Sequence, residues 1–376
     1  MEHRGTSPAF AVGTQEAPEL AGLFDRTGPF VTVYLPTRPD IDNAAQRSLQ
    51  QWRPVRDELT EAGAPASALD AVEALLPNAH HDGSTLAAVA DESGVLISRS
   101  GSEAPARPLG YFQTLPVVAP LVAWWQASLP HVLVVADRVG ADITAVAPAG
   151  PSADSVDGGG GPHLHKQAPG GWSQRRFQER AENLWEANAK AVAERTVSVA
   201  EYIGARAVLV AGDVRALQFL REHLPGRVAA LVRELGGSRG ADGGDEPFLE
   251  DSRKQMASVA AEDTVAILEK FREEKGQADR AVDGPSATIE ALNAAAADIV
   301  LVHDDPDDRR LAWYDPEGHV LGLDPTRIAP YGVKQPAQGR LVDVCIRSAL
   351  RTGARVRTVP STSVAQGVGA LMRFTS

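Results

Sequence analysis

The sequence has almost no cysteine, since Cys345 is the single one among 376 residues. One thiol cannot form an internal disulfide, which excludes a disulfide-stapled secreted scaffold and favours a reducing compartment. Long apolar runs are also missing. The longest, residues 117–127, is interrupted by Pro120 and Gln126 and is shorter than the roughly 18 residues that suggest a membrane span. The first 30 residues lack a basic segment followed by an apolar one. We therefore expect no secretory signal and no membrane partner, and a soluble protein in the cytoplasm.

Basic residues are fewer than acidic ones, so the net charge is −12 at pH 7. Residues 1–128 carry −7 of it, against −3 for residues 129–250 and −2 for residues 251–376. This balance argues against sequence-blind binding to free nucleic acid, although a local surface of an acidic protein can still bind a structured RNA. A hydrophobic fraction of 43% with 23% charged residues indicates a folded chain. Its length favours two or three domains.

Motifs for nucleotide, metal or nucleophilic chemistry are missing too. The glycine runs at 158–161 and 243–244 lack the Lys and Ser/Thr that complete a P-loop. His163 and His165 have no cysteine nearby, so we do not predict a metal site. The acidic run 304–308 lacks the spacing of a calcium loop and is expected to be a solvated turn. Cys345 follows the apolar side of a helical pattern and is expected to pack rather than react. We expect no metal, no cofactor and no conventional enzyme.

The most informative segment present is a glycine-rich tract that leads into a long helical pattern. Glycines and histidines dominate residues 158–166, and the helical pattern runs from Ser173 to about Ile203. Glycine permits close backbone approach, tryptophan can stack on a base, and arginine can donate to phosphate. The candidate RNA-binding residues are Gly170, Gly171, Trp172, Ser173, Gln174, Arg175 and Arg176. We expect the loop 158–173 to project from the protein. Composition alone favours the plainer alternative of a surface loop followed by an amphipathic helix.

Alternating strand and helix patterns predict an α/β protein of three domains, at residues 1–128, 129–250 and 251–376. Apolar runs predict strands at 30–35, 85–90, 94–98, 131–137, 141–146, 207–212, 299–303 and 355–359. Helical periodicity predicts helices at 43–62, 66–76, 173–203, 213–223, 248–275, 286–297 and 341–352. The adjacent Trp124 and Trp125 are expected to pack between domains.

From about residue 131 onward, the order of elements resembles the middle and C-terminal domains of the archaeal and eukaryotic class-I release factor and Pelota superfamily. Residues 170–177 fall where those release factors carry Gly-Gly-Gln, followed by a small residue, an Arg and a Phe on a long helix. Residues 284–305 and 367–374 resemble the first helix and strand, and the closing strand, of their C-terminal domain. Within the superfamily the chain is most similar to the bacterial branch that includes the ribosome hibernation factor Balon. Residues 1–128 show no stop-codon-reading motif.

This resemblance implies a three-domain release-factor-like architecture. Its α/β middle domain would carry the glycine-rich loop and the long helix, and its C-terminal domain would be an α/β/α sandwich. It also implies binding to the 70S ribosome, with elongation factor Tu or a similar translational GTPase as partner of the C-terminal domain from about Asp283. Trp172 stands where release factors carry the Gln that positions the hydrolytic water, and an indole N–H can only donate a hydrogen bond. We therefore expect a hibernation factor that occupies the vacant A site up to the peptidyl transferase centre, without release chemistry.

Two alternatives stay open. Gln174 could position water through a remodelled loop, which would make the protein a peptidyl-tRNA hydrolase acting in release or ribosome rescue. A misplacement of about 1 Å can cost on the order of 100-fold in rate, so we rank this reading second. The chain could instead be a small-molecule metabolic enzyme with a cleft between its α/β domains. The missing nucleotide-binding motifs count against that reading.

Overall fold

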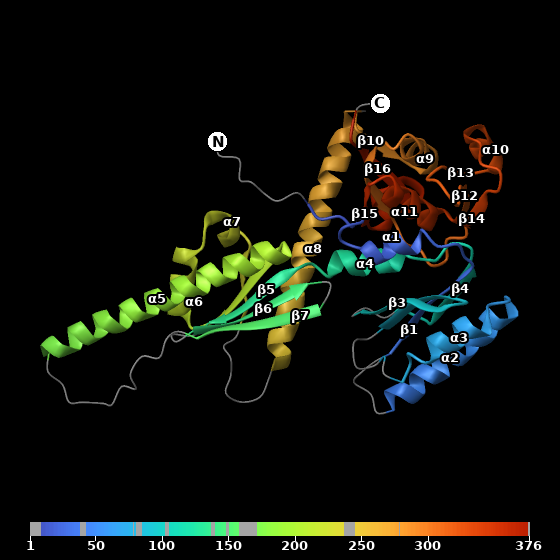
Figure 1. Ribbon diagram of the computed structural model, residues 1–376. Helices are drawn as coiled ribbons and strands as arrows, with labels where there is room; N and C mark the ends of the chain where they lie inside the picture. The colour runs from blue at the N-terminus through green and yellow to red at the C-terminus, as the bar shows by residue number, and fades with distance from the viewer. Residues whose placement is uncertain are drawn as a thin grey trace. The chain divides into compact units, whose positions relative to one another are not determined.

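The computed structural model describes residues 9–37, 43–77, 79, 85–101, 105–136, 140–147, 150–157, 171–236, 245–277 and 279–374. Within this part, the chain forms two compact units (Figure 1). The middle unit contains residues 127–263, and the split unit combines residues 10–126 with residues 264–376. The finer division into three domains stays a prediction.

A five-stranded sheet forms the middle unit, in the order β7-β6-β5-β8-β9. Its strands are β5 (His131–Ala136), β6 (Gly140–Ala147), β7 (Gly150–Asp157), β8 (Ala207–Gly212) and β9 (Val232–Glu234). β5 pairs antiparallel with β6 and parallel with β8, so the sheet is mixed. Residues 207–211 of β8 are all buried, which explains why this strand is apolar throughout rather than alternating.

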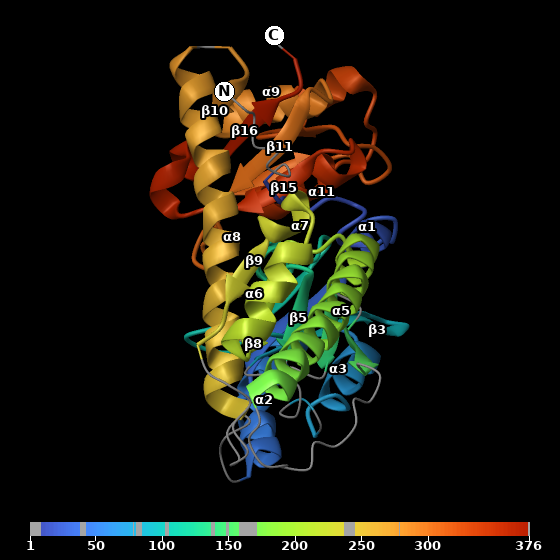
Figure 2. The same cartoon turned by 90° about the vertical axis from the view of Figure 1, so that its left-hand side faces the viewer.

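Two helices cover one face of this sheet. The middle unit contains α5 (Gly171–Ile203), α6 (Val214–His223), α7 (Gly226–Ala229) and the first part of α8 (Asp245–Gly276). α5 and α6 lie side by side (Figure 2). The buried residues of α5 recur at helical spacing: Ala189, Val192, Ala193, Thr196 and Ala200. Val192, Ala193 and Ala200 share a core with β5 and β8, so residues 192–200 anchor α5 to the sheet.

The N-terminal half of the split unit is built on an antiparallel sheet in the order β3-β2-β1-β4. Its strands are β1 (Phe30–Pro36), β2 (Thr85–Asp91), β3 (Gly94–Gly101) and β4 (Leu109–Gln113), and its helices are α1 (Pro18–Leu23), α2 (Ala44–Glu61), α3 (Ala66–Glu73) and α4 (Ala119–Ala127). Alternate residues of β1 face two cores. Val31, Val33 and Leu35 pack with α2 and α3, whereas Phe30 and Tyr34 pack on the opposite side of the sheet.

The C-terminal half contains a sheet in the order β10-β16-β11-β15 and a smaller sheet in the order β13-β12-β14. Their strands are β10 (Ala281–Asp283), β11 (Ala297–Val302), β12 (Leu311–Tyr314), β13 (Leu321–Gly322), β14 (Ala337–Arg340), β15 (Arg355–Thr358) and β16 (Val368–Met372). The helices are α9 (Pro285–Asn293), α10 (Pro325–Ile328) and α11 (Leu341–Arg351). α9 and α11 pack on one face of the larger sheet, and Phe271 of α8 approaches Gly369 on the other. Helices therefore lie on both faces, which is the predicted α/β/α arrangement.

α4 joins the two halves of the split unit, although about 220 residues of sequence separate it from its partners. The side-chain amide of Gln126 donates to the Thr358 carbonyl at 3.1 Å and accepts from the Thr358 amide at 2.9 Å. Trp125 is buried in a core that both halves share, and Trp124 packs edge-on against Tyr34 at 6.0 Å. Both tryptophans and their partners lie within the one split unit, so the expectation that the pair packs between domains stays a prediction.

Most predicted elements are observed, with ends that move by a few residues. The structure also contains elements that the sequence did not predict: α1, α4, α7, α10, β4, β7, β9, β10, β12, β13 and β14. They are short or lack a regular apolar period. No described helix has the length and apolar character needed to cross a membrane.

Candidate functional site

The predicted RNA-binding residues fall at the start of α5. Gly170 and the rest of the tract 158–170 lie outside the described residues, so the expectation of a projecting loop is untested. The structure places the backbone of Gly171, Trp172, Ser173, Gln174, Arg175 and Arg176 in the first turns of α5. These six residues are therefore brought together as consecutive positions of one helix. α5 has 33 residues, which at 1.5 Å per residue makes it about 50 Å long.

The connection from β8 to α6 depends on close backbone contact. Gly212 ends β8 with φ of +133°, a conformation that a residue with a side chain rarely adopts. The next residue, Asp213, caps α6 because its carboxylate accepts from the Arg215 and Ala216 amides. The carboxyl ends of parallel strands in open α/β sheets are common ligand positions. Here the Asp213 carboxylate is used for capping.

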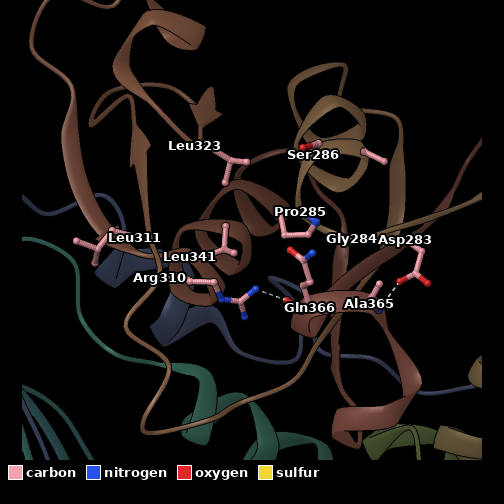
Figure 3. Close-up of a pocket in the computed structure, with 11 residues that line it drawn as sticks. Asp283, Gly284, Pro285, Ser286, Arg310, Leu311, Leu323, Leu341, Ala365 and Gln366 are labelled. Atoms are coloured by element: carbon pink, nitrogen blue, oxygen red, sulfur yellow. Dashed lines mark hydrogen bonds between the residues drawn. The ribbon is translucent and has the colours of Figure 1, made fainter.

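A cavity of about 570 Å³ lies in the C-terminal half of the split unit (Figure 3). Its walls come from the start of α9, from β12, from the start of α11 and from residues 365–366. Leu311 and Leu323 line it and are 45% and 44% exposed, so the cavity has an open apolar side. A second cavity of about 340 Å³ shares Arg310 and Gln366 with the first.

Three charged groups of these cavities, Arg310, Asp308 and Asp283, have ion-pair partners. Arg310 donates to both carboxylate oxygens of Asp308 and to the Gln366 carbonyl. This hydrogen bonding lowers the pKa of Asp308 and raises the pKa of Arg310. Asp283 accepts from the Ala365 amide and from Lys275. Because Arg310 and Asp283 of the larger cavity already have charged partners, this cavity offers shape and apolar surface rather than an acid or base poised for catalysis.

The predicted solvated turn at 304–308 is confirmed for residues 305–307, which are exposed, but it is wrong for Asp304 and Asp308. Asp304 is half-buried and accepts from Arg340, and Asp308 pairs with Arg310. The sequence gives no local signal for these ion pairs, because Arg340 lies 36 residues after Asp304.

The structure also bears on the thiol and the histidines considered in the sequence. Cys345 is fully buried in α11, where burial raises the pKa of its thiol to about 12, so the packing interpretation is confirmed. His163 and His165 lie outside the described residues. In the described part of the chain, no group of three or more His, Cys, Asp or Glu side chains is placed to hold a metal ion.

Comparison with known proteins connects the middle unit to translation factors. Residues 130–277 match the family described as bacterial archaeo-eukaryotic release factor family 2. This segment contains the mixed sheet of the middle unit together with α5 and α8. The match supports the resemblance of this segment to release factors. No match is found among curated proteins.

Solved structures give weaker similarity over nearly the whole chain. The archaeal translation termination factor aRF1 is 17% identical with a TM-score of 0.26, over 99% of this chain and 100% of that chain. Pelota from Archaeoglobus fulgidus is 13% identical with a TM-score of 0.35, over 96% and 93%. A chain of a ribosome-bound archaeal Pelota and ABCE1 model is 12% identical with a TM-score of 0.38, over 97% and 95%. Scores this low do not establish a common overall arrangement.

Proposed function

We propose that this protein is a ribosome-binding translation factor that occupies the vacant A site of idle 70S ribosomes and reaches the peptidyl transferase centre. The observation that carries this proposal is the family match at residues 130–277, which includes the whole of α5 and the six described residues of the candidate RNA-binding set. This function would place the protein in the cytoplasm.

The position of these residues on α5 suits insertion into a narrow RNA passage. α5 begins at Gly171 and packs on the sheet at Val192, and between these two residues it rises about 32 Å at 1.5 Å per residue. Positions 172, 175 and 176 are related by helical steps of three and four, which places them on one side of the helix. One aromatic and two arginines on one side combine base stacking with phosphate contact, and stacking contributes about 1–3 kcal/mol per base.

The residue at position 172 decides between occupancy and hydrolysis. Trp172 stands where the resemblance places the Gln that positions water. An indole offers one N–H donor and no acceptor, so it cannot hold a water by donating and accepting as an amide does. We therefore assign hibernation by occupancy as the main function. Hydrolysis through Gln174 is the second candidate, because that amide also lies in the first turns of α5.

Co-sedimentation with 70S ribosomes tests binding. We expect the protein to pellet with ribosomes and the double variant Arg175→Glu/Arg176→Glu to stay in the supernatant. Arg215→Glu is the matched control, because Arg215 is an exposed arginine at the start of α6 in the same unit. Wild-type protein that stays in the supernatant would refute the proposal and favour the metabolic alternative.

A peptidyl-tRNA release assay on programmed ribosomes tests chemistry. We expect release no faster than in buffer alone. Rapid release that disappears in Gln174→Ala would replace the hibernation assignment with release or rescue. Retained release in that variant would exclude Gln174 as the water-positioning group.

Elongation factor Tu is the partner we propose for the C-terminal half, from about Asp283 onward. Delivery by a GTPase would help an acidic protein to approach ribosomal RNA despite charge repulsion. Cryo-electron microscopy of ribosomes from starved cells should show the chain in the A site. Its absence there, or its presence on separated subunits only, would contradict the assignment.

A further inference from the structure

A buried charged cluster joins the two halves of the split unit at the start of α4. Asp343 of α11 is 1% exposed, and its Oδ1 accepts from the Val118 amide at 2.8 Å and the Ala119 amide at 3.0 Å. A carboxylate that accepts from the first amides of a helix acts as an N-cap. Here the cap comes from a residue more than 220 positions later in the chain. The contact therefore holds α4 to the C-terminal half.

The second carboxylate oxygen of Asp343 accepts no hydrogen bond from the described residues. Its Oδ2 lies 3.3 Å from Nη1 of Arg340, but neither atom makes a hydrogen bond with any described residue. Arg340 is 5% exposed and directs Nη2 to Oδ1 of Asp304 at 3.1 Å and to the Asp305 carbonyl at 3.0 Å. The Arg340 guanidinium is thus the ion-pair partner of both Asp304 and Asp343, but of these two carboxylates it donates a hydrogen bond only to Asp304.

Arg340 is the cation that pairs with both Asp343 and Asp304. The titratable and charged groups around Asp343 and its partners are Arg340, Asp304, Tyr34 of β1, Tyr111 of β4 and Cys345 of α11, with His303 and Asp305 near Asp304, Arg107 near Tyr111, and Arg310 near Cys345. With both carboxylates ionised, the cluster holds one excess negative charge in a buried place. Burial raises the pKa of Asp343 to about 6, and burial also raises the pKa of Asp304.

We propose that the Asp343 cluster is a proton-sensitive contact, which takes up a proton in mildly acidic solution and then holds the two halves of the split unit together more firmly. Protonation removes the excess negative charge, while the neutral carboxyl can still accept from the Val118 and Ala119 amides through Oδ1. This proposal is independent of the ribosomal function.

The direction in which the stability changes with pH follows from the difference between the folded and unfolded pKa of Asp343. An aspartate in the unfolded chain has a pKa of about 3.9, so the folded state binds the proton more tightly. The stabilisation is complete below about pH 4 and is lost as the pH rises through about 6. The free energy of unfolding should therefore increase as the pH falls from about 7 to about 5. Groups whose pKa is lowered by folding, such as Asp308, give the opposite trend.

Hydrogen exchange of the α4 amides, corrected for intrinsic rates, measures this contact in the full-length protein. We expect the protection of wild-type α4 to rise about tenfold between about pH 7 and about pH 5, since each unit of pKa difference corresponds to tenfold in the equilibrium. Asp343→Asn imitates the protonated side chain and should abolish the rise while keeping α4 protected. Asp308→Asn is the matched control, with the rise retained.

An unchanged rise in Asp343→Asn would overturn the proposal, and so would wild-type protection that falls over this range. If Asp343→Asn does not fold, the carbon-13 titration of the Asp343 carboxyl in wild-type protein decides the question. A midpoint near 6 supports the proposal, and a midpoint near the unfolded value of about 4 refutes it.

Discussion

Replacing Gly212 by alanine should open the parallel pair of strands at the centre of the middle unit. Gly212 pairs with Ala136 at the end of β8 and has φ of +133°. A Cβ at this position would overlap the Ala136 carbonyl oxygen, which also accepts from the Asp213 amide at 3.1 Å. The strands must therefore separate, or the backbone must leave its conformation.

The magnitude follows from two contributions. A disfavoured backbone conformation costs about 1–3 kcal/mol, and loss of the adjoining hydrogen bond costs about 1 kcal/mol. We expect a total of about 2–4 kcal/mol, which corresponds to roughly a 30- to 900-fold increase in the opening equilibrium. Gly204→Ala is the matched control, because Gly204 has φ of +61° with open space around its Cα. That change should cost only about 1 kcal/mol.

Hydrogen exchange monitored by mass spectrometry can test both variants in the full-length protein. Peptides from β5 and β8 should exchange much faster in Gly212→Ala than in Gly204→Ala, and peptides from α9 in the split unit should exchange at the wild-type rate. Equal exchange in the two glycine variants would refute the argument from close contact. Faster exchange throughout both units would show that the effect is not confined to this sheet.

Two further substitutions and one labelling experiment test the split unit. Gln126→Ala removes both hydrogen bonds to Thr358 and should lower the free energy of unfolding by about 1–2 kcal/mol in denaturant titration; an unchanged midpoint would contradict this. Arg357→Met should lower it by about 2–4 kcal/mol, because Arg357 is fully buried and donates to the Phe10 carbonyl and to Thr264; an effect under about 1 kcal/mol would contradict this. Cys345 should resist iodoacetamide in native protein and react once the protein is unfolded, since burial raises its pKa to about 12; rapid native alkylation would show that α11 opens.

The elements that the sequence predicts share a regular apolar pattern. The continuous apolar run of β8 and the periodic stripe of α5 each reflect burial that local sequence can record. β7 illustrates the opposite case. Its residues, Gly-Pro-Ser-Ala-Asp-Ser-Val-Asp, include few strand formers, yet they pair along the full length of β6. Backbone pairing with an existing strand here outweighs intrinsic propensity, which no local pattern reveals.

Contacts between segments that are distant in the sequence could not be predicted from local pattern either. The cap that Asp343 provides for α4 and the pairing of Gln126 with Thr358 connect residues more than 220 positions apart. A single sequence records each partner but not the contact between them. For this reason, the acidic run 304–308 seemed solvated, whereas Arg340 in fact draws Asp304 into a buried cluster.

The candidate RNA-binding residues were located by their resemblance to a motif. The charges of the described residues bear on how these residues could bind RNA. Several described arginines are held by carboxylates of their own unit, as Arg206 is by Asp263 and Arg310 is by Asp308. Such pairs neutralise part of the positive charge of a protein whose net charge is already −12. Binding to RNA through α5 would therefore depend on few phosphate contacts, together with stacking and shape. Because counterion release scales with the number of phosphates neutralised, this mode suits a fixed ribosomal cavity better than free RNA.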